Sequence, residues 1–229
     1  MLLNQYSNGY RYNSDTIFLY NFISKYKIKG SLLDIGSGCG ILGLLIKRDF
    51  PHVSLSQIDI QDKNVYLTKK NALANDIDSK VLLGDFATYC FEEKYDFTIS
   101  NPPFYHSGTL KSEDESLFLS RHSDALKIDD LVKKAYSILK PKGSLILCYD
   151  AKQIDTILTK LSISKFKVNE LQFIHVNLEK PATLVMIYAK RESKSLCKIL
   201  PPLVLYDKGE YTQFVKNIFK KADTNSEDT

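Results

Sequence analysis

The feature that most constrains this chain is a glycine-dense turn between an apolar strand and an apolar helix. Residues 31–35 read as a buried strand, and the apolar residues from Ile41 onward recur at helix spacing. Gly36, Gly38 and Gly40 lie in the five residues between these elements. Glycine permits positive φ and leaves the backbone bare, so a ligand can approach main-chain N–H groups at the helix start. An ordinary turn of this kind needs only one glycine, so the pattern predicts a nucleotide-binding turn.

Two classes of cofactor fit this turn. Gly38, Gly40 and Gly43 satisfy the G-x-G-x-x-G spacing of a dinucleotide site, although that spacing alone is weak. Asp34 ends the strand before the first glycine, and a carboxylate there suits an ammonium or a sulfonium better than a pyrophosphate. The arrangement Asp34-x-Gly36-x-Gly38-x-Gly40 resembles the first motif of class I S-adenosylmethionine-dependent methyltransferases. We expect Asp34 to face the amino acid end of that cofactor.

Length and composition favour one cytoplasmic domain without a metal centre. The 229 residues suffice for one well-buried α/β domain and are few for two. No apolar run approaches the roughly 20 residues of a membrane span, and residues 1–9 are polar rather than signal-like. The four cysteines are far apart, with no C-x-x-C and no nearby histidine pair, so we expect reduced thiols and no zinc site.

The basic residues are concentrated in the C-terminal third. Residues 152–221 hold 13 basic and 6 acidic side chains, whereas the overall net charge is only +4. This excess is compatible with a phosphate-rich partner, and equally with a lysine-rich solvated surface. Residues 222–229 are polar and acidic, so we expect a disordered tail there.

An amphipathic helix is predicted ahead of the first strand, within a lead-in of residues 1–30. Its apolar residues start at Ile17 and recur at helix spacing, and Ser14 is a suitable residue for the cap. The helix can simply cover one edge of the sheet. The alternative is that Ser14 and Asp15 also line the cofactor pocket.

Acidic residues follow two later strands. Asp59 ends the second strand, and ligands of open α/β sheets bind beyond such strand ends, where a carboxylate can hold a ribose diol. Its alternative role is to cap the helix that begins at Gln61. After the third strand, Asp85 can accept from an adenine amino group while Phe86 packs on the ring. A plain turn acid beside a core phenylalanine explains this pair equally well.

The fourth strand, residues 95–100, runs directly into Asn101-Pro102-Pro103-Phe104. The prolines fix the backbone, so the Asn101 amide and the Pro102 carbonyl can point as acceptors into the same cleft as the glycine turn. A merely rigid loop explains the prolines but not the flanking asparagine and phenylalanine.

A long polar connection, residues 106–127, follows this exit. Long loops in compact domains are usually functional or mobile, and Arg121 in this one can hold a phosphate or pair with a nearby acid. The chain then alternates again between helix and strand. It ends with three strand-like segments that predict antiparallel pairs at one sheet edge, residues 166–176, 183–189 and 199–206.

Taken together, these motifs resemble the class I methyltransferases that modify amino groups conjugated to a ring or carbonyl. The shared features are the glycine turn, the acids after the second and third strands, and the Asn-Pro-Pro-Phe exit. The longer stretches Asn101-Pro-Pro-Phe-Tyr-x-x-Gly108 and Gly9-Tyr-Arg-Tyr-x-x-Asp15, with the run Lys180–Arg191, are similar to one branch. That branch is the bacterial tRNA1(Val) adenine-37 N6-methyltransferases.

The resemblance implies a fold and a site. The fold is a single Rossmann-like α/β domain over residues 31–221, with a mostly parallel seven-stranded sheet, antiparallel C-terminal strands and helices on both faces. It implies S-adenosylmethionine as cofactor, the anticodon loop of a tRNA as partner, a monomer, and no metal or membrane. The implied catalytic residues are Asn101, Pro102 and Phe104, with Phe104 and Arg121 on the substrate. The implied cofactor-binding residues are Asp15, Asp34, Gly36, Gly38, Gly40, Asp59, Asp85 and Phe86.

Other functions remain open at this stage. Position 104 is phenylalanine, which guanine N2-methyltransferases of ribosomal RNA also accept. A protein glutamine methyltransferase uses the same exit, but usually carries a separate N-terminal recognition domain. A nicotinamide dehydrogenase leaves residues 101–104 unexplained, and a non-catalytic RNA-binding module does not need the complete set of motifs.

Overall fold

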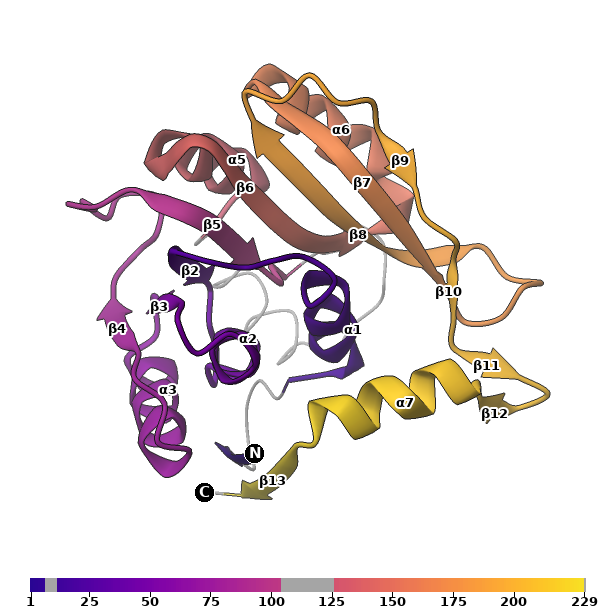
Figure 1. Ribbon diagram of the computed structural model, residues 1–229, viewed down its shortest axis with the longest axis horizontal. Helices are drawn as coiled ribbons and strands as arrows, with labels where there is room; N and C mark the ends of the chain where they lie inside the picture. Colours follow the sequence, from indigo (N-terminus) through magenta and orange to yellow (C-terminus); the bar gives the residue numbers. More distant parts are fainter. Residues whose placement is uncertain (7–11, 104–125, 229) are drawn as a thin grey trace, which may run out of the picture.

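The computed structural model describes residues 1–6, 12–103 and 126–228, and its centre is a mostly parallel sheet with helices on both faces (Figure 1). Hydrogen-bonded neighbours in the main sheet follow the order β10-β7-β8-β6-β5-β2-β3-β4, with β9 also on β7. The strands are β2 (Ser31–Ile35), β3 (Ser54–Asp59), β4 (Lys80–Leu83), β5 (Tyr95–Ser100), β6 (Leu139–Asp150), β7 (Phe166–His175), β8 (Ala182–Arg191), β9 (Lys198–Ile199) and β10 (Leu203–Val204). The predicted α/β fold is confirmed.

Helices cover the sheet in two groups, each with its own apolar cluster. The first cluster joins β1 (Leu2–Gln5), α1 (Ser14–Ile23), α2 (Ile41–Asp49), α3 (Asp62–Ala74) and α7 (Gln213–Ala222) to one face. The second joins α5 (Ile128–Ile138) and α6 (Ile154–Ile163) to the other face. Burial of apolar side chains on both faces explains why the central strands read as nearly continuous apolar runs.

Strand register brings the carboxyl ends of the central strands together. β2 pairs in parallel with both β3 and β5, so Ile35 lies beside Ile58 on one side and Ser100 on the other. The glycine turn, Asp59 and Asn101 each follow one of these three residues in the chain. The three predicted motifs therefore lie together at the carboxyl ends of the central strands.

The C-terminal third differs from the sequence prediction in two places. Residues 199–206 do not form one antiparallel strand, because Pro201 and Pro202 interrupt it. They leave β9 and β10, both parallel to β7, and the start of β11 (Tyr206–Asp207), which pairs with β12 (Glu210–Tyr211) in a separate ribbon. Within the described residues the main sheet has nine strands rather than seven. The tail was expected to be disordered, yet β13 (Asn225–Asp228) pairs in parallel with β1. Local polarity could not indicate a backbone partner at the other end of the chain.

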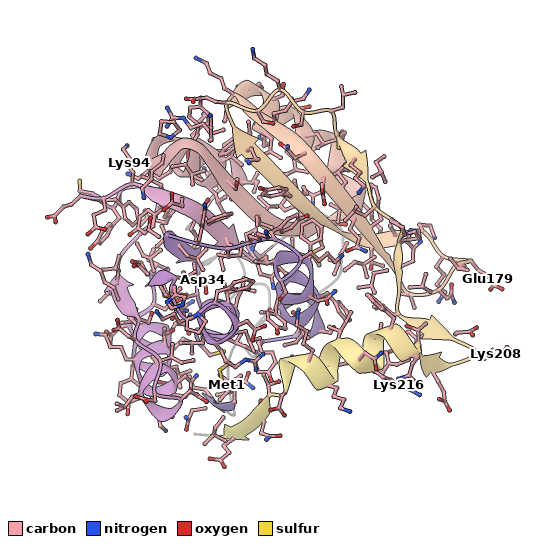
Figure 2. The ribbon with its side chains drawn as sticks, viewed as in Figure 1. Met1, Asp34, Lys94, Glu179, Lys208 and Lys216 are labelled. Carbon is pink, nitrogen blue, oxygen red and sulfur yellow. The ribbon has the colours of Figure 1, made fainter. Side chains whose placement is uncertain are left out.

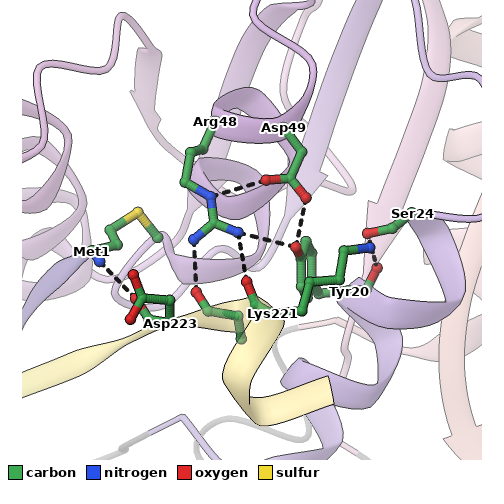
Figure 3. A network of polar contacts seen from close by, with 8 residues as sticks. Met1, Tyr20, Ser24, Arg48, Asp49, Lys221 and Asp223 are labelled. Carbon is green, nitrogen blue, oxygen red and sulfur yellow. Dashed lines mark hydrogen bonds and ion pairs between the residues drawn. The ribbon is translucent and has the colours of Figure 1, made fainter. Parts of the chain in front are cut away.

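The C-terminal end of α7 is held by Arg48 of α2 (Figure 3). The Arg48 guanidinium donates to the carbonyl oxygens of Ala222 at 2.6 Å and Lys221 at 3.1 Å. It also donates to the Tyr20 hydroxyl at 3.0 Å, and that hydroxyl donates to Asp49 at 2.5 Å. A cation at the carbonyl end of a helix is favourable, so this contact fixes where the chain leaves α7.

The glycine turn adopts the left-handed backbone that the sequence predicts. Gly36, Gly38 and Gly40 have φ values of 68°, 58° and 87°. A Cβ atom on Gly40 would lie 2.8 Å from Cγ2 of Thr68, whereas one on Gly36 would meet no heavy atom within 4 Å. Gly40 is therefore required by packing as well as by φ, and Gly36 borders open space.

These two glycines give a matched pair of variants. Gly36→Ala should lower the free energy of unfolding by about 1–2 kcal/mol through left-handed strain alone. Gly40→Ala adds the clash with Thr68 and should cost about 1–3 kcal/mol more. Urea denaturation of both variants measures the difference. Equal losses would show that the contact with Thr68 does not constrain the turn.

Candidate active site

A pocket opens at the edge where the glycine turn, α1 and the end of β5 meet. It is lined by Tyr12, Thr16, Asp34, Gly36, Ser37, Cys39, Ile41, Leu42 and Asn101. Three of the predicted site residues, Asp34, Gly36 and Asn101, are among them. The pocket therefore lies between the glycine turn and the Asn-Pro-Pro segment that follows β5.

Asn101 has one bonded and one free end. Its Nδ2 donates to Oγ1 of Thr16 at 2.9 Å, and Thr16 is only 4% exposed. Its Oδ1 is buried and has no hydrogen-bond partner among the described residues. Buried acceptors are rarely left unpaired unless a ligand or water completes them. The bond to Thr16 thus holds the carboxamide in place, and its oxygen remains available to a bound group.

The other residues of the exit are only partly described. Pro102 is buried directly after Asn101. Phe104 and Arg121, predicted to contact the substrate, lie outside the described residues, so their roles stay predictions.

Asp34 is buried beneath the start of α2, in the middle of the molecule (Figure 2). It is 1% exposed, and its Oδ2 accepts from the Gly43 N–H at 3.0 Å and from Nε2 of Gln57 at 3.2 Å. The pKa of Asp34 is raised to about 7. Burial is the main cause, these two bonds oppose it, and the charge of Asp59 adds to it. The carboxyl group therefore changes its charge near neutral pH.

Asp59 links the glycine turn to α3. Its Oδ2 accepts from the Gly38 N–H at 2.8 Å, and its Oδ1 accepts from the Gln61 N–H at 2.9 Å and from Nδ2 of Asn64 at 3.1 Å. The side chain thus supports the start of the helix, which was the alternative to the ribose-binding role. Each carboxylate oxygen can accept more than one bond, so these contacts leave Oδ2 able to accept another.

Asp85, Phe86 and Asp15 are not among the residues that line the pocket. Oδ1 of Asp85 accepts from the Ala87 N–H at 2.9 Å, which is the geometry of a turn acid. Phe86 is 4% exposed and packs 5.7 Å from the Phe91 ring in the core. The Asp15 carboxylate accepts from Nδ2 of Asn13 at 2.9 Å, within the N-terminal turn of α1. Contacts of these residues with the cofactor stay predictions.

Sequence reasoning missed several lining residues. Tyr12 and Thr16 line the pocket, and both lie close in the chain to Ser14 and Asp15, which the sequence suggested. Cys39 also lines it, and burial raises the pKa of its thiol to about 11. The thiol therefore stays neutral and is not poised as a nucleophile.

The pocket fits a small polar cofactor. Oγ of Ser37 is buried without a partner in the described part of the chain, and Gly36 beside it borders open space. The amino acid moiety of S-adenosylmethionine supplies both donors and acceptors for such an atom, so the residues present fit this cofactor.

Among residues 1–6, 12–103 and 126–228, no group of three or more His, Cys, Asp or Glu side chains is placed to hold a metal ion. No helix in the same ranges is long and apolar enough to span a bilayer.

The shifted Asp34 predicts a pH dependence of stability. Because the folded protein holds this proton up to about pH 7 and the unfolded chain loses it near the ordinary value of 3.8, unfolding becomes easier as pH rises between these values. Asp34→Asn keeps an acceptor oxygen but cannot ionise. Its free energy of unfolding should therefore fall less between pH 5 and pH 7 than that of the wild type, as chemical denaturation can measure. Parallel curves for the two proteins would contradict the shift.

Comparison with known proteins identifies the family. The methyltransferase small domain model matches residues 6–169. A tRNA1(Val) (adenine(37)-N6)-methyltransferase from Pedobacter heparinus is 27% identical over 173 residues, covering 75% of this chain and 73% of the relative. A ribosomal RNA small subunit methyltransferase C from Buchnera aphidicola is 37% identical over 81 residues, which is 35% of this chain and 23% of that protein.

Solved structures show the same fold. A predicted O-methyltransferase from Agrobacterium tumefaciens superposes with a TM-score of 0.71 at 16% identity, covering 94% of this chain and all of that one. A Thermus thermophilus 16S rRNA N2 G1207 methyltransferase, solved with AdoMet and guanosine, gives a TM-score of 0.57 at 19% identity, covering 80% and 44% of the two chains. With the family model matching more than half of its length, this chain belongs to the methyltransferase small domain family and is an S-adenosylmethionine-dependent methyltransferase.

Proposed function

We propose that this enzyme methylates the exocyclic amine of an RNA base, specifically N6 of adenosine 37 in the anticodon loop of tRNA1(Val). The observation that carries the proposal is the buried, unpaired Oδ1 of Asn101 beside the glycine turn. The name of the Pedobacter relative supports the choice of base and RNA. An anticodon loop is already single-stranded, which lowers the cost of bringing a base into the pocket.

An exocyclic amine is a poor nucleophile because its lone pair is delocalised into the ring. Asn101 Oδ1 and the Pro102 carbonyl can each accept one amine hydrogen, which draws the nitrogen toward a tetrahedral geometry. The bond to Thr16 holds the Asn101 carboxamide in place. S-adenosylmethionine would supply an electrophilic methyl group, and transfer would require the localised lone pair of the amine to be directed at that methyl group.

The proton balance needs no dedicated base. After transfer, the amine nitrogen carries a positive charge and becomes strongly acidic. Asn101 Oδ1 can hold one of its hydrogens until the proton leaves to water. Neither a histidine nor an ionised cysteine is required by this sequence of events.

Asn101→Ala is the direct test. Loss of the acceptor should lower methyl transfer to tRNA by about 10²–10³-fold, as for removal of one polar contact to a transition state. The measurement is incorporation of label from S-adenosylmethionine into total bacterial tRNA, followed by nucleoside digestion. Calorimetric affinity for the cofactor should change little.

Asn217→Ala on α7, where the side-chain oxygen accepts from Gln213, serves as the matched control and should retain activity. N6-methyladenosine at position 37 supports the proposal. N2-methylguanosine in ribosomal RNA, the modification that the name of the Thermus relative gives, would move the target to guanine. Label in protein glutamine, or none in RNA, would contradict RNA methylation.

Two pairs of lysines in the C-terminal third lie at opposite edges of the sheet. Lys152 follows β6 and Lys180 lies between β7 and β8, at the same edge as Asn101. Lys165 precedes β7, and Lys167 is the second residue of that strand, at the opposite edge. About six residues of extended strand, or about 20 Å, separate the two edges. RNA phosphates next to a bound base would therefore meet the first pair of lysines.

Lysine-to-glutamate variants at each edge test from which side the RNA approaches. Lys152→Glu/Lys180→Glu should raise KM for tRNA about tenfold and flatten its salt dependence, with kcat and cofactor affinity unchanged. Lys165→Glu/Lys167→Glu makes the same charge change at the far edge and should alter KM less than twofold. Steady-state kinetics at several salt concentrations measure both. An equal or larger effect at the far edge would show that RNA approaches from there.

We also propose that the enzyme acts as a monomer. Support comes from the pocket, because one chain supplies glycine turn, Thr16 and Asn101 together. Activity per molecule that is constant across a dilution series is the expected behaviour.

A further inference from the structure

The two ends of the chain form a small parallel ribbon next to the cofactor pocket. β13 pairs with β1, so that Gln5 lies opposite Asp228 and Leu3 opposite Ser226. The Met1 amino group donates to the Asp223 carbonyl at 2.6 Å, and the Asn225 N–H donates to the Met1 carbonyl at 2.9 Å. Figure 1 shows the two termini beside each other, and Figure 3 shows the Met1–Asp223 contact.

Tyr12 connects this ribbon to the pocket. Its hydroxyl lies 3.0 Å from Oγ of Ser226 and donates to Oγ1 of Thr224 at 3.3 Å. Its N–H donates to Oε1 of Gln5 at 3.1 Å, and Nε2 of Gln5 donates to Ser226 at 2.9 Å. Gln5, Tyr12 and Ser226 thus form a closed ring of hydrogen bonds. Tyr12 is at the same time part of the pocket lining.

The other side of the ribbon reaches the glycine turn. Oδ1 of Asn71 accepts from the Asn4 N–H at 2.7 Å, and Nδ2 of Asn71 donates to the Cys39 carbonyl at 2.8 Å. Cys39 also lines the pocket. The ribbon therefore touches the pocket wall at two points, through Tyr12 and through Asn71.

We propose that the C-terminal strand β13 is a positioning element of the cofactor site, acting through the Tyr12 hydroxyl. Thr224 and Ser226 bind that hydroxyl and so hold the Tyr12 side chain in place, and Tyr12 lines the pocket. Without these bonds the pocket is complete in a smaller fraction of molecules, and the apparent affinity for S-adenosylmethionine falls by that fraction. The proposal rests on the cofactor and not on the RNA substrate.

A double-mutant cycle tests this coupling. Thr224→Ala/Ser226→Ala removes the tail hydroxyls, and Tyr12→Phe removes the pocket-side hydroxyl while keeping the ring. Each change should raise the Kd for S-adenosylmethionine about five- to tenfold, the loss of one to two hydrogen bonds. The combined variant should bind no more weakly than either parent, because all three hydroxyls serve one contact. Titration calorimetry of the full-length protein gives these constants.

Two controls separate positioning from general destabilisation. Thr224→Ser/Ser226→Thr keeps both hydroxyls and should restore wild-type affinity. Glu227→Ala changes the same strand at an exposed side chain and should have no effect on Kd. Wild-type affinity in the Ala pair, or additive losses in the combined variant, would overturn the proposal. If the RNA proposal is wrong, methyl transfer to tRNA is absent while these variants still show the expected changes in Kd for S-adenosylmethionine.

Discussion

The glycine turn after β2 is held by side chains from three directions, and the rest of the site depends on this support. Asp59 accepts from the Gly38 N–H, Thr68 donates to the Gly38 carbonyl at 2.9 Å, and Gln57 donates to the Gly40 carbonyl at 2.9 Å. The N–H groups of Gly36 and Ser37 both donate to the Ile58 carbonyl. The turn is therefore shaped before any ligand binds, and little ordering remains to be done on binding. The sequence suggested free N–H groups for a ligand, whereas the protein uses most of them itself.

A neutral hydrogen-bond acceptor at position 101 suits a site that already contains two buried carboxyl groups. Asp34 and Asp59 already place two buried carboxyl groups at the same edge, and Asp59 disfavours ionisation of Asp34. A third carboxylate there would add repulsion in a poorly solvated region. The carboxamide of Asn101 supplies a lone pair without a charge, and its bond to Thr16 holds it in place. The acceptor is thus obtained without ionisation.

Much of the fold and part of the site could be predicted because their signals are local. The glycine turn, the acids at strand ends and the Asn-Pro-Pro exit each occupy a few consecutive residues, and parallel pairing brings strand ends together by rule. Contacts between distant segments left no such signal. Nothing near Thr16 indicates Asn101 as its partner 85 residues away. Asp85 was ambiguous for the opposite reason, since one local pattern serves both a turn and a binding site.

The tail shows why polarity alone misjudged this chain. Asn225–Asp228 has no apolar side chain, and by composition it should remain solvated. The side chains of Asn75 and Asn71 bond the main chain of Leu2 and Asn4 on one side of its partner β1. The other side pairs with β13, and a strand edge can recruit a segment of almost any composition. Arg48 determines where α7 ends, so the following residues are delivered to that edge at little entropic cost. Order in the tail therefore comes from the position of its anchor, and the same anchor places Thr224 and Ser226 within reach of Tyr12.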